Sequence, residues 1–117
     1  MDKKILVVED DKGARETLAS LLKHKYAVIT AEDGQEGLEL WMREADVLAL
    51  VISDYAMPRL NGDDMIKTAR SLQLRTPTII FSGVDRECEP DTICLRKIFD
   101  QLKLFELVAD IMSRPAA

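Results

Sequence analysis

Residues 4–11, Lys-Ile-Leu-Val-Val-Glu-Asp-Asp, contain the stretch that decides the fold class of this chain. Its apolar part, residues 5–8, is a continuous run of branched side chains with no polar residue at alternate positions. Such a run is typical of a β-strand that is covered on both faces, as in a parallel sheet. The acidic residues that follow it predict that the strand ends at a polar edge.

Short apolar runs alternate with longer amphipathic stretches along the rest of the chain, which predicts an α/β fold. Further strands are expected over residues 26–30, 48–52 and 78–81, the last of them after Pro77. Because strand–helix–strand units wind right-handed, these strands should be parallel. Helices are expected where apolar side chains recur at helical spacing: Ala14, Leu18, Leu21 and Leu22; Leu38, Trp41 and Ala45; Met65, Ile66, Ala69 and Leu72; and Leu104, Val108, Ile111 and Met112.

Ligands of parallel α/β sheets bind in the crevice outside the carboxyl ends of the strands. Polar residues end the expected strands of this chain: Glu9 and Asp10, Asp54, and Ser82. Carboxylates gathered at one edge repel each other, and their burial is unfavourable unless a cation or a proton compensates the charge. Oxygen ligands without Cys or His suit Mg²⁺. Asp54 could then attack phosphorus and form an acyl phosphate, while Ser82 donates its hydroxyl to a phosphoryl oxygen.

The bulk composition indicates one domain that spans residues 1–117. The net charge of −5 argues against direct nucleic-acid binding through phosphate contacts. Cys88 and Cys94 fit neither a zinc site nor a disulfide framework, so two reduced thiols are expected. With no signal peptide and no run long enough to cross a bilayer, we expect a cytoplasmic protein without a membrane partner.

Three motifs of the chain resemble the receiver domain of bacterial two-component response regulators. They are residues 4–11, residues 51–58 (Val-Ile-Ser-Asp-Tyr-Ala-Met-Pro) with Asn61-Gly62, and residues 76–83 (Thr-Pro-Thr-Ile-Ile-Phe-Ser-Gly). The resemblance covers essentially the whole chain, in the right order. It implies a flavodoxin-like (CheY-like), doubly wound, five-stranded parallel sheet of order 2-1-3-4-5. It also implies a signalling module rather than an enzyme, which takes a phosphoryl group from a histidine kinase or phosphotransfer protein and contacts a downstream protein partner.

The resemblance also assigns roles to individual residues. Glu9 and Asp10 match the family's Mg²⁺-binding acidic pair, and Asp54 matches its phospho-acceptor, which also binds the metal. The backbone carbonyl of Ala56 matches a further metal ligand, and Ser82 matches the switch Ser/Thr. The family also has a Lys that contacts the phosphoryl group, and the candidates for it are Lys97 first, then Arg96 and Lys103.

The second half of the chain departs from the family pattern. Ile98 replaces the proline that normally follows the Lys, so the turn that aims Lys97 is expected to differ. Only fourteen residues separate Ser82 from Lys97, where the family has a complete helix and a strand. Pro90 would also interrupt a helix there, so the fourth helix should be missing or reduced to a turn. The sheet face left exposed would favour a homodimer or a segment-swapped dimer.

Other interpretations stay open beside this one. The chain could be a pseudo-receiver, a scaffold for protein contacts that phosphorylation does not regulate. A phosphatase with an Asp nucleophile is disfavoured, because Ala56 stands where such enzymes place their second carboxylate. Asp54 could be a solvated turn residue, and Ser82 could bond only to backbone. Glu9-Asp10 could cap a helix, although Asp11 is better placed for that role.

Overall fold

The computed structural model describes residues 3–83, 88, 91–96 and 101–114, with residues 101 and 102 described by backbone alone. Five parallel strands form one sheet of order β2-β1-β3-β4-β5, so the predicted fold class and strand order are confirmed. The elements are β1 (Lys4–Val8), α1 (Lys12–Lys23), β2 (Ala27–Ala31), α2 (Gly34–Arg43), β3 (Leu48–Asp54), α3 (Gly62–Ser71), β4 (Thr78–Ser82), β5 (Thr92–Arg96) and α4 (Gln101–Met112).

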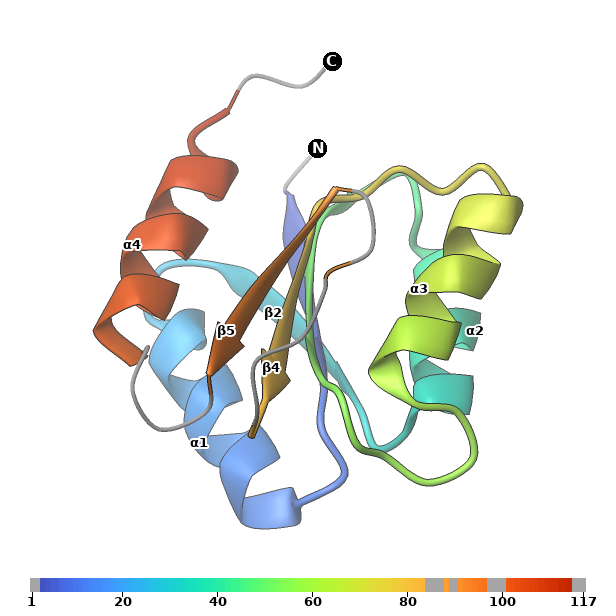
Figure 1. Ribbon diagram of the computed structural model, residues 1–117. Helices are drawn as coiled ribbons and strands as arrows, with labels where there is room; N and C mark the ends of the chain where they lie inside the picture. The colour runs from blue at the N-terminus through green and yellow to red at the C-terminus, as the bar shows by residue number, and fades with distance from the viewer. Residues whose placement is uncertain (1–2, 84–87, 89–90, 97–100, 115–117) are drawn as a thin grey trace.

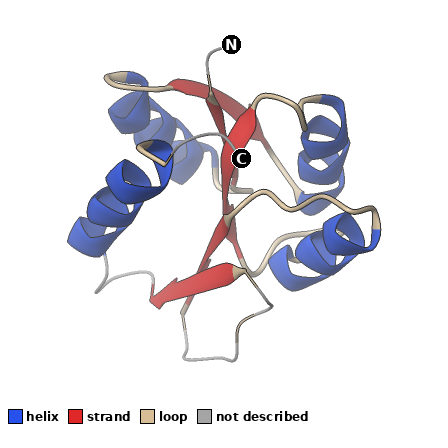
Figure 2. Ribbon diagram, turned by 90° about the horizontal axis from the view of Figure 1, so that it is seen from above, coloured by secondary structure: helices blue, strands red, loops and turns tan. Residues whose placement is uncertain are grey.

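Helices cover both faces of the sheet, with α1 and α4 on one side and α2 and α3 on the other (Figures 1 and 2). Residues of β1 alternate between the two cores that result. Ile5 and Val7 pack with α1 and α4, whereas Leu6 and Val8 pack with α2 and α3. Both faces of this strand are therefore buried, and for that reason its sequence is apolar without alternation.

Three helices begin at a residue whose side chain accepts a hydrogen bond from the first turn. Asp11 accepts from the backbone N–H of residue 14 at 2.7 Å, and Asp33 and Asn61 do the same in α2 and α3 at 2.8 Å each. The predicted apolar stripes are partly wrong. Leu21 is 51% exposed because α1 buries only a narrow stripe, and Leu72 is 46% exposed because it caps the end of α3.

Arg70 joins α3 to the start of β4 and β5. Its guanidinium lies 5.8 Å from the ring centroid of the fully buried Trp41, and it donates to the carbonyl of Thr76 at 3.0 Å. It also donates to the hydroxyl of Thr78 at 3.3 Å and the carbonyl of Asp91 at 3.4 Å. Burial lowers the pKa of this guanidinium below its usual value, and the negative charge of Asp91 opposes that shift.

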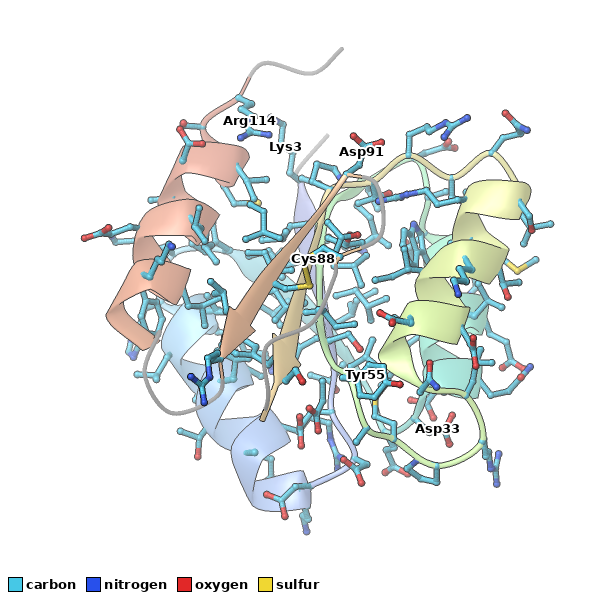
Figure 3. The ribbon with its side chains drawn as sticks, viewed as in Figure 1. Lys3, Asp33, Tyr55, Cys88, Asp91 and Arg114 are labelled. Carbon is cyan, nitrogen blue, oxygen red and sulfur yellow. A yellow bond between two sulfur atoms is a disulfide. The ribbon has the colours of Figure 1, made fainter. Side chains whose placement is uncertain are left out.

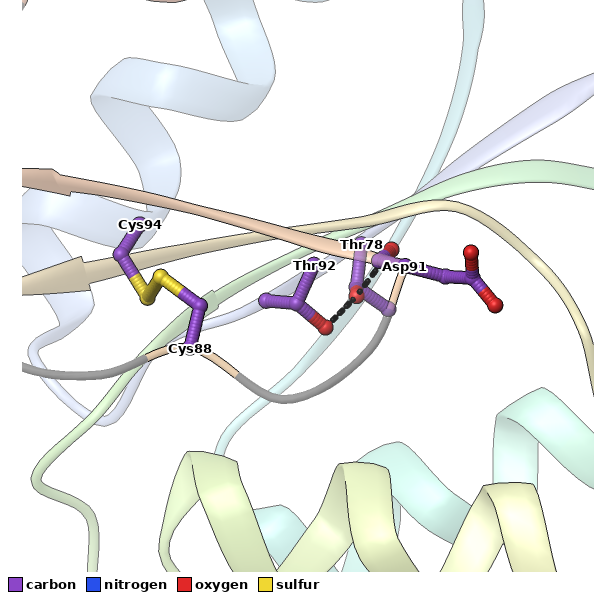
Figure 4. Close-up of a disulfide and its surroundings, with 5 residues drawn as sticks. All are labelled: Thr78, Cys88, Asp91, Thr92 and Cys94. Carbon is purple, nitrogen blue, oxygen red and sulfur yellow. Dashed lines mark hydrogen bonds between the residues drawn. A yellow bond between two sulfur atoms is a disulfide. The ribbon is translucent and has the colours of Figure 1, made fainter.

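The expected loss of the fourth helix is not contradicted, because no helix is found among the residues described between β4 and β5, which are Gly83, Cys88 and Asp91. The expected pair of reduced thiols is wrong, because Cys88 and Cys94 form a disulfide with Cα atoms 5.9 Å apart (Figure 4). The chain turns at Asp91, which has a φ of 60°, and so brings residues six positions apart face to face. Within the described part, no helix is long and apolar enough to cross a membrane.

Candidate metal centre

Glu9, Asp10 and Asp54 form a cluster of carboxylates in which one oxygen of each lies within 4.8 Å of the others. Glu9 and Asp10 follow β1, and Asp54 is the last residue of β3. The two strands are neighbours, and Val8 pairs with Ser53 in their register. The residues that come next on each strand therefore meet at the carboxyl edge of the sheet, as the sequence predicts.

The members of this cluster differ in their exposure to solvent. Asp54 is only 5% exposed, Glu9 is half-buried and Asp10 is exposed. A carboxylate as buried as Asp54 requires compensation of its charge, especially beside two other acids. The exposed Asp10 leaves the cluster open to solvent on one side, so an ion or a small anionic substrate can reach it.

The donor set fits Mg²⁺. All of its side-chain donors are carboxylate oxygens, which hard divalent cations prefer, and it contains no Cys or His. The oxygen ligands of a single Mg²⁺ lie up to about 4 Å apart, so the separation seen here requires only small side-chain rotations. The alternative interpretation of Asp54 as a solvated turn residue does not fit its burial. The residue that caps α1 is Asp11 rather than either member of the acidic pair, and one carboxylate oxygen of Glu9 accepts from the N–H of Asp11 at 3.2 Å.

Arg15 is a supporting residue that the sequence interpretation missed. Its guanidinium donates to the backbone carbonyl of Glu9 at 2.9 Å and lies 3.7 Å from the carboxylate of Glu32, with its side chain only 12% exposed. Glu9 is held further by its N–H, which donates to the carbonyl of Ala31 at 3.1 Å. Arg15 is the fourth residue of α1 and lies six positions after Glu9. A cation this close in sequence to an acidic pair was the available sequence signal.

The backbone around Asp54 is fixed by close contacts. Ser53 donates its hydroxyl to the carbonyl of Asp54 at 2.7 Å, and the N–H of Tyr55 donates to the carbonyl of residue 81 at 2.8 Å. A Cβ added to Gly62 would lie 2.6 Å from the carbonyl oxygen of Asp54 and 2.5 Å from Cδ1 of Ile80. Only glycine therefore fits beside the backbone of Asp54, a requirement that the Asn61-Gly62 motif did not reveal from sequence.

The remaining predicted site residues are placed less completely. Ser82 ends β4 and is 4% exposed; it follows Phe81, which pairs with Asp54 across the strands. Gly83 is exposed, and a Cβ added there would meet no atom within 4 Å, so the space beside Ser82 is open. Ala56 lies exposed in the loop after β3, on the edge that Tyr55 marks in Figure 3.

Lys97, the preferred candidate for the phosphoryl-contacting cation, lies outside the described residues. Its alternatives, Arg96 at the end of β5 and Lys103 in α4, are both exposed. The structure therefore unites the three carboxylates, puts Ser82 at the same edge, and leaves the choice of the lysine as a prediction.

A groove of about 420 Å³ opens beside Glu9, between α1 and α4. Leu21 and Phe105, two of the large apolar side chains that are exposed, contribute to its wall. The groove thus joins an apolar surface directly to the acidic cluster. Its lining consists of Glu9, Gly13, Ala14, Thr17, Leu18, Leu21, Phe81, Leu104 and Phe105.

Comparison with known proteins agrees with this arrangement. The family model described as the response regulator receiver domain matches residues 5–103. The chain is 33% identical over 121 residues to the alkaline phosphatase synthesis transcriptional regulatory protein PhoP of Bacillus subtilis (strain 168), an alignment that covers 98% of this chain and 43% of that protein. It is 32% identical over 82 residues to the cell cycle transcriptional regulator CtrA of Caulobacter vibrioides (strain NA1000 / CB15N), covering 68% of this chain and 34% of that protein.

The chain therefore spans less than half the length of these two relatives. Among solved structures, the receiver domain from the hybrid histidine kinase CckA superposes with a TM-score of 0.81 at 33% identity. That superposition covers 94% of this chain and 99% of the other, so the similarity extends over the whole fold.

Proposed function

Because the chain belongs to the response regulator receiver domain family, we propose that it is a phospho-accepting receiver of a two-component phosphorelay. Asp54 takes a phosphoryl group from a histidine kinase or phosphotransfer protein, and the domain then signals by contact with a downstream protein. The observation that carries this proposal is the cluster of Glu9, Asp10 and Asp54, with Asp54 buried at the end of β3.

The transfer step requires charge neutralisation more than covalent chemistry. Glu9, Asp10 and Asp54 would hold Mg²⁺ through their carboxylates, and the carbonyl of Ala56 would add a further ligand. When bound, the ion neutralises the carboxylates and the phosphoryl oxygens as they approach each other. One carboxylate oxygen of Asp54 attacks phosphorus and forms an acyl phosphate. The bond from phosphorus to the imidazole nitrogen of the donor breaks, and that nitrogen keeps the electron pair.

Residues around Asp54 would hold the product. Ser82 donates its hydroxyl to a phosphoryl oxygen, and the open space beside Gly83 leaves room for the group. Lys97 would supply a cation to another phosphoryl oxygen, although its position is not described. The phosphoryl group carries a charge of about −1.5 to −2 in place of the single negative charge of the Asp54 carboxylate, and this change biases the end of β4 towards a different arrangement.

The groove between α1 and α4 suits the approach of a donor protein. It lies beside Glu9, and its exposed apolar side chains Leu21 and Phe105 would be covered in a complex. A donor helix placed there would bring its phosphohistidine towards the solvent-open side of the cluster. The acidic charge of the chain gives no support to direct nucleic-acid binding, so the output is a protein contact.

The test is phosphorylation by acetyl phosphate, a small donor that needs no partner protein. We expect labelling of the wild type with Mg²⁺, none after chelation, and none in Asp54→Asn. Asp46→Asn is the matched control, because Asp46 is an exposed aspartate beyond the opposite end of β3. Equal labelling of both variants would contradict the proposal. Absence of labelling in the wild type would favour the scaffold function instead.

A further inference from the structure

The disulfide between Cys88 and Cys94 joins the β4–β5 connection to the edge strand of the sheet (Figure 4). Cys88 is exposed, and Cys94 is half-buried against the core that α2 and α3 share. A small thiol or disulfide in solution can therefore reach the sulfur of Cys88. These are the only cysteines in the chain, so each has one possible partner within the molecule.

The disulfide is close in the fold to the phospho-acceptor. Cys94 pairs with Ile80 across β4 and β5, and Ile80 lies two residues before Ser82. The side chain of Ile80 also packs beside Gly62, which in turn lies against the carbonyl of Asp54. One strand pairing and a series of packed residues therefore connect Cys94 to Asp54, so oxidation of Cys94 can affect the acceptor.

A second anchor already fixes the far end of the connection, where β5 begins. The hydroxyls of Thr78 and Thr92 are 2.5 Å apart, and the hydroxyl of Thr78 also donates to the carbonyl of Asp91 at 3.3 Å. The backbone N–H of Thr78 donates to the same carbonyl at 3.4 Å. The start of β5 is thus held in the sheet without the disulfide, which acts further along the strand, at Cys94 opposite Ile80.

From these observations we propose that Cys88 and Cys94 are a reversible redox modification site that controls phosphorylation of Asp54. In the oxidised form, the disulfide fastens Cys94 to Cys88 and restricts the adjustment of β5 and of its pairing with Ile80 in β4. In the reduced form, this restraint is absent, and Ser82, two residues after Ile80, can follow the phosphoryl group. The control of Asp54 rests on the proposed function, whereas the redox site itself does not.

Formation of the bond is an exchange with a low-molecular-weight disulfide such as oxidised glutathione. The thiolate of Cys88 attacks one sulfur of that disulfide and releases one glutathione thiolate. The thiolate of Cys94 then attacks the sulfur of Cys88 in the mixed disulfide and releases the second glutathione. Two electrons pass to the glutathione sulfurs, which take up the two protons that the cysteines release. Disulfides in reducing compartments are usually transient or redox-sensing, in agreement with this role.

The first experiment measures the thiols alone. The wild type is equilibrated in glutathione buffers of graded ratio, its remaining thiols are alkylated, and its intact mass is determined. We expect loss of two hydrogens without retained glutathione, complete reversal by dithiothreitol, and a single glutathione adduct on Cys94→Ser. Dimers linked between chains, or retained glutathione on the wild type, would overturn the redox site.

The second experiment compares oxidised and reduced wild type for the rate of labelling by acetyl phosphate with Mg²⁺. We expect the reduced form to label on the order of fivefold faster, within the usual range of coupling between sites. The variant Cys88→Ser with Cys94→Ser should label at one rate in both buffers. Equal rates for the two wild-type forms would overturn the control of Asp54. If neither form is labelled, the proposed function fails while the thiol measurement still decides the redox site.

Discussion

Replacement of Gly62 by alanine should damage both the stability and the acceptor site. The added Cβ would lie 2.6 Å from the backbone oxygen of Asp54 and 2.5 Å from Cδ1 of Ile80. Ile80 can rotate, but the backbone of Asp54 must retreat by roughly 0.8 Å to restore ordinary contact. Overpacking of this kind lowers the free energy of unfolding by about 1–3 kcal/mol. Because Asp54 moves, labelling by acetyl phosphate should also slow.

Gly13→Ala is the matched control, because Gly13 also lies in the first turn of a helix. Its added Cβ would meet only a carboxylate oxygen of Asp11, at an ordinary 3.5 Å. Neither glycine has a positive φ, so the two substitutions differ only in the space available for the added Cβ. Gly13→Ala should leave stability unchanged or raise it by up to about 1 kcal/mol. Urea unfolding decides the comparison, and a Gly62→Ala variant as stable as Gly13→Ala would refute the packing argument.

Three further predictions concern charge, docking and the disulfide. Without Mg²⁺, Asp54→Asn should raise the free energy of unfolding by about 1–2 kcal/mol in urea titration. The reason is that each of the other two carboxylates, within 4.8 Å, repels the Asp54 carboxylate by about 1 kcal/mol in water. An unchanged urea midpoint would contradict this repulsion. Leu21→Ala should slow transfer from a phosphorylated donor protein about fivefold and leave acetyl phosphate labelling unchanged, whereas Leu72→Ala, equally exposed on the other face, should change neither. Reduction of the Cys88–Cys94 disulfide should lower the free energy of unfolding by about 2 kcal/mol, as expected for so short a loop. An unchanged free energy of unfolding in calorimetry would contradict a stabilising role of the disulfide.

The local pattern of apolar residues was sufficient to predict those parts of the fold in which a whole strand is buried. Residues 5–8 are apolar throughout because β1 is covered on both faces, and that pattern alone predicts a parallel sheet. Asp54 could be predicted as a site residue because every parallel strand delivers its last residue to the same edge. The loss of the helix after β4 is a prediction from Pro90 and the short spacing, and the residues described there do not contradict it.

Features that depend on how a turn or a helix start places two residues against each other could not be predicted from the sequence. The pairing of Cys88 with Cys94 follows from the turn at Asp91, and the spacing of six residues does not specify it. Arg15 supports Glu9 through a backbone carbonyl, an interaction that depends on how α1 leaves the sheet. Helical periodicity also fails where a helix buries only a narrow stripe, so that Leu21 is exposed at the groove although its spacing matched the core.

The central claim is that Asp54 accepts the phosphoryl group with the help of the acidic pair. Its most direct test is borohydride reduction of the labelled protein, which converts an aspartyl phosphate to homoserine, followed by peptide mass mapping. We predict homoserine at position 54 alone, present with Mg²⁺ and acetyl phosphate and absent after chelation. Homoserine at another aspartate, or unmodified Asp54 under both conditions, would contradict the account.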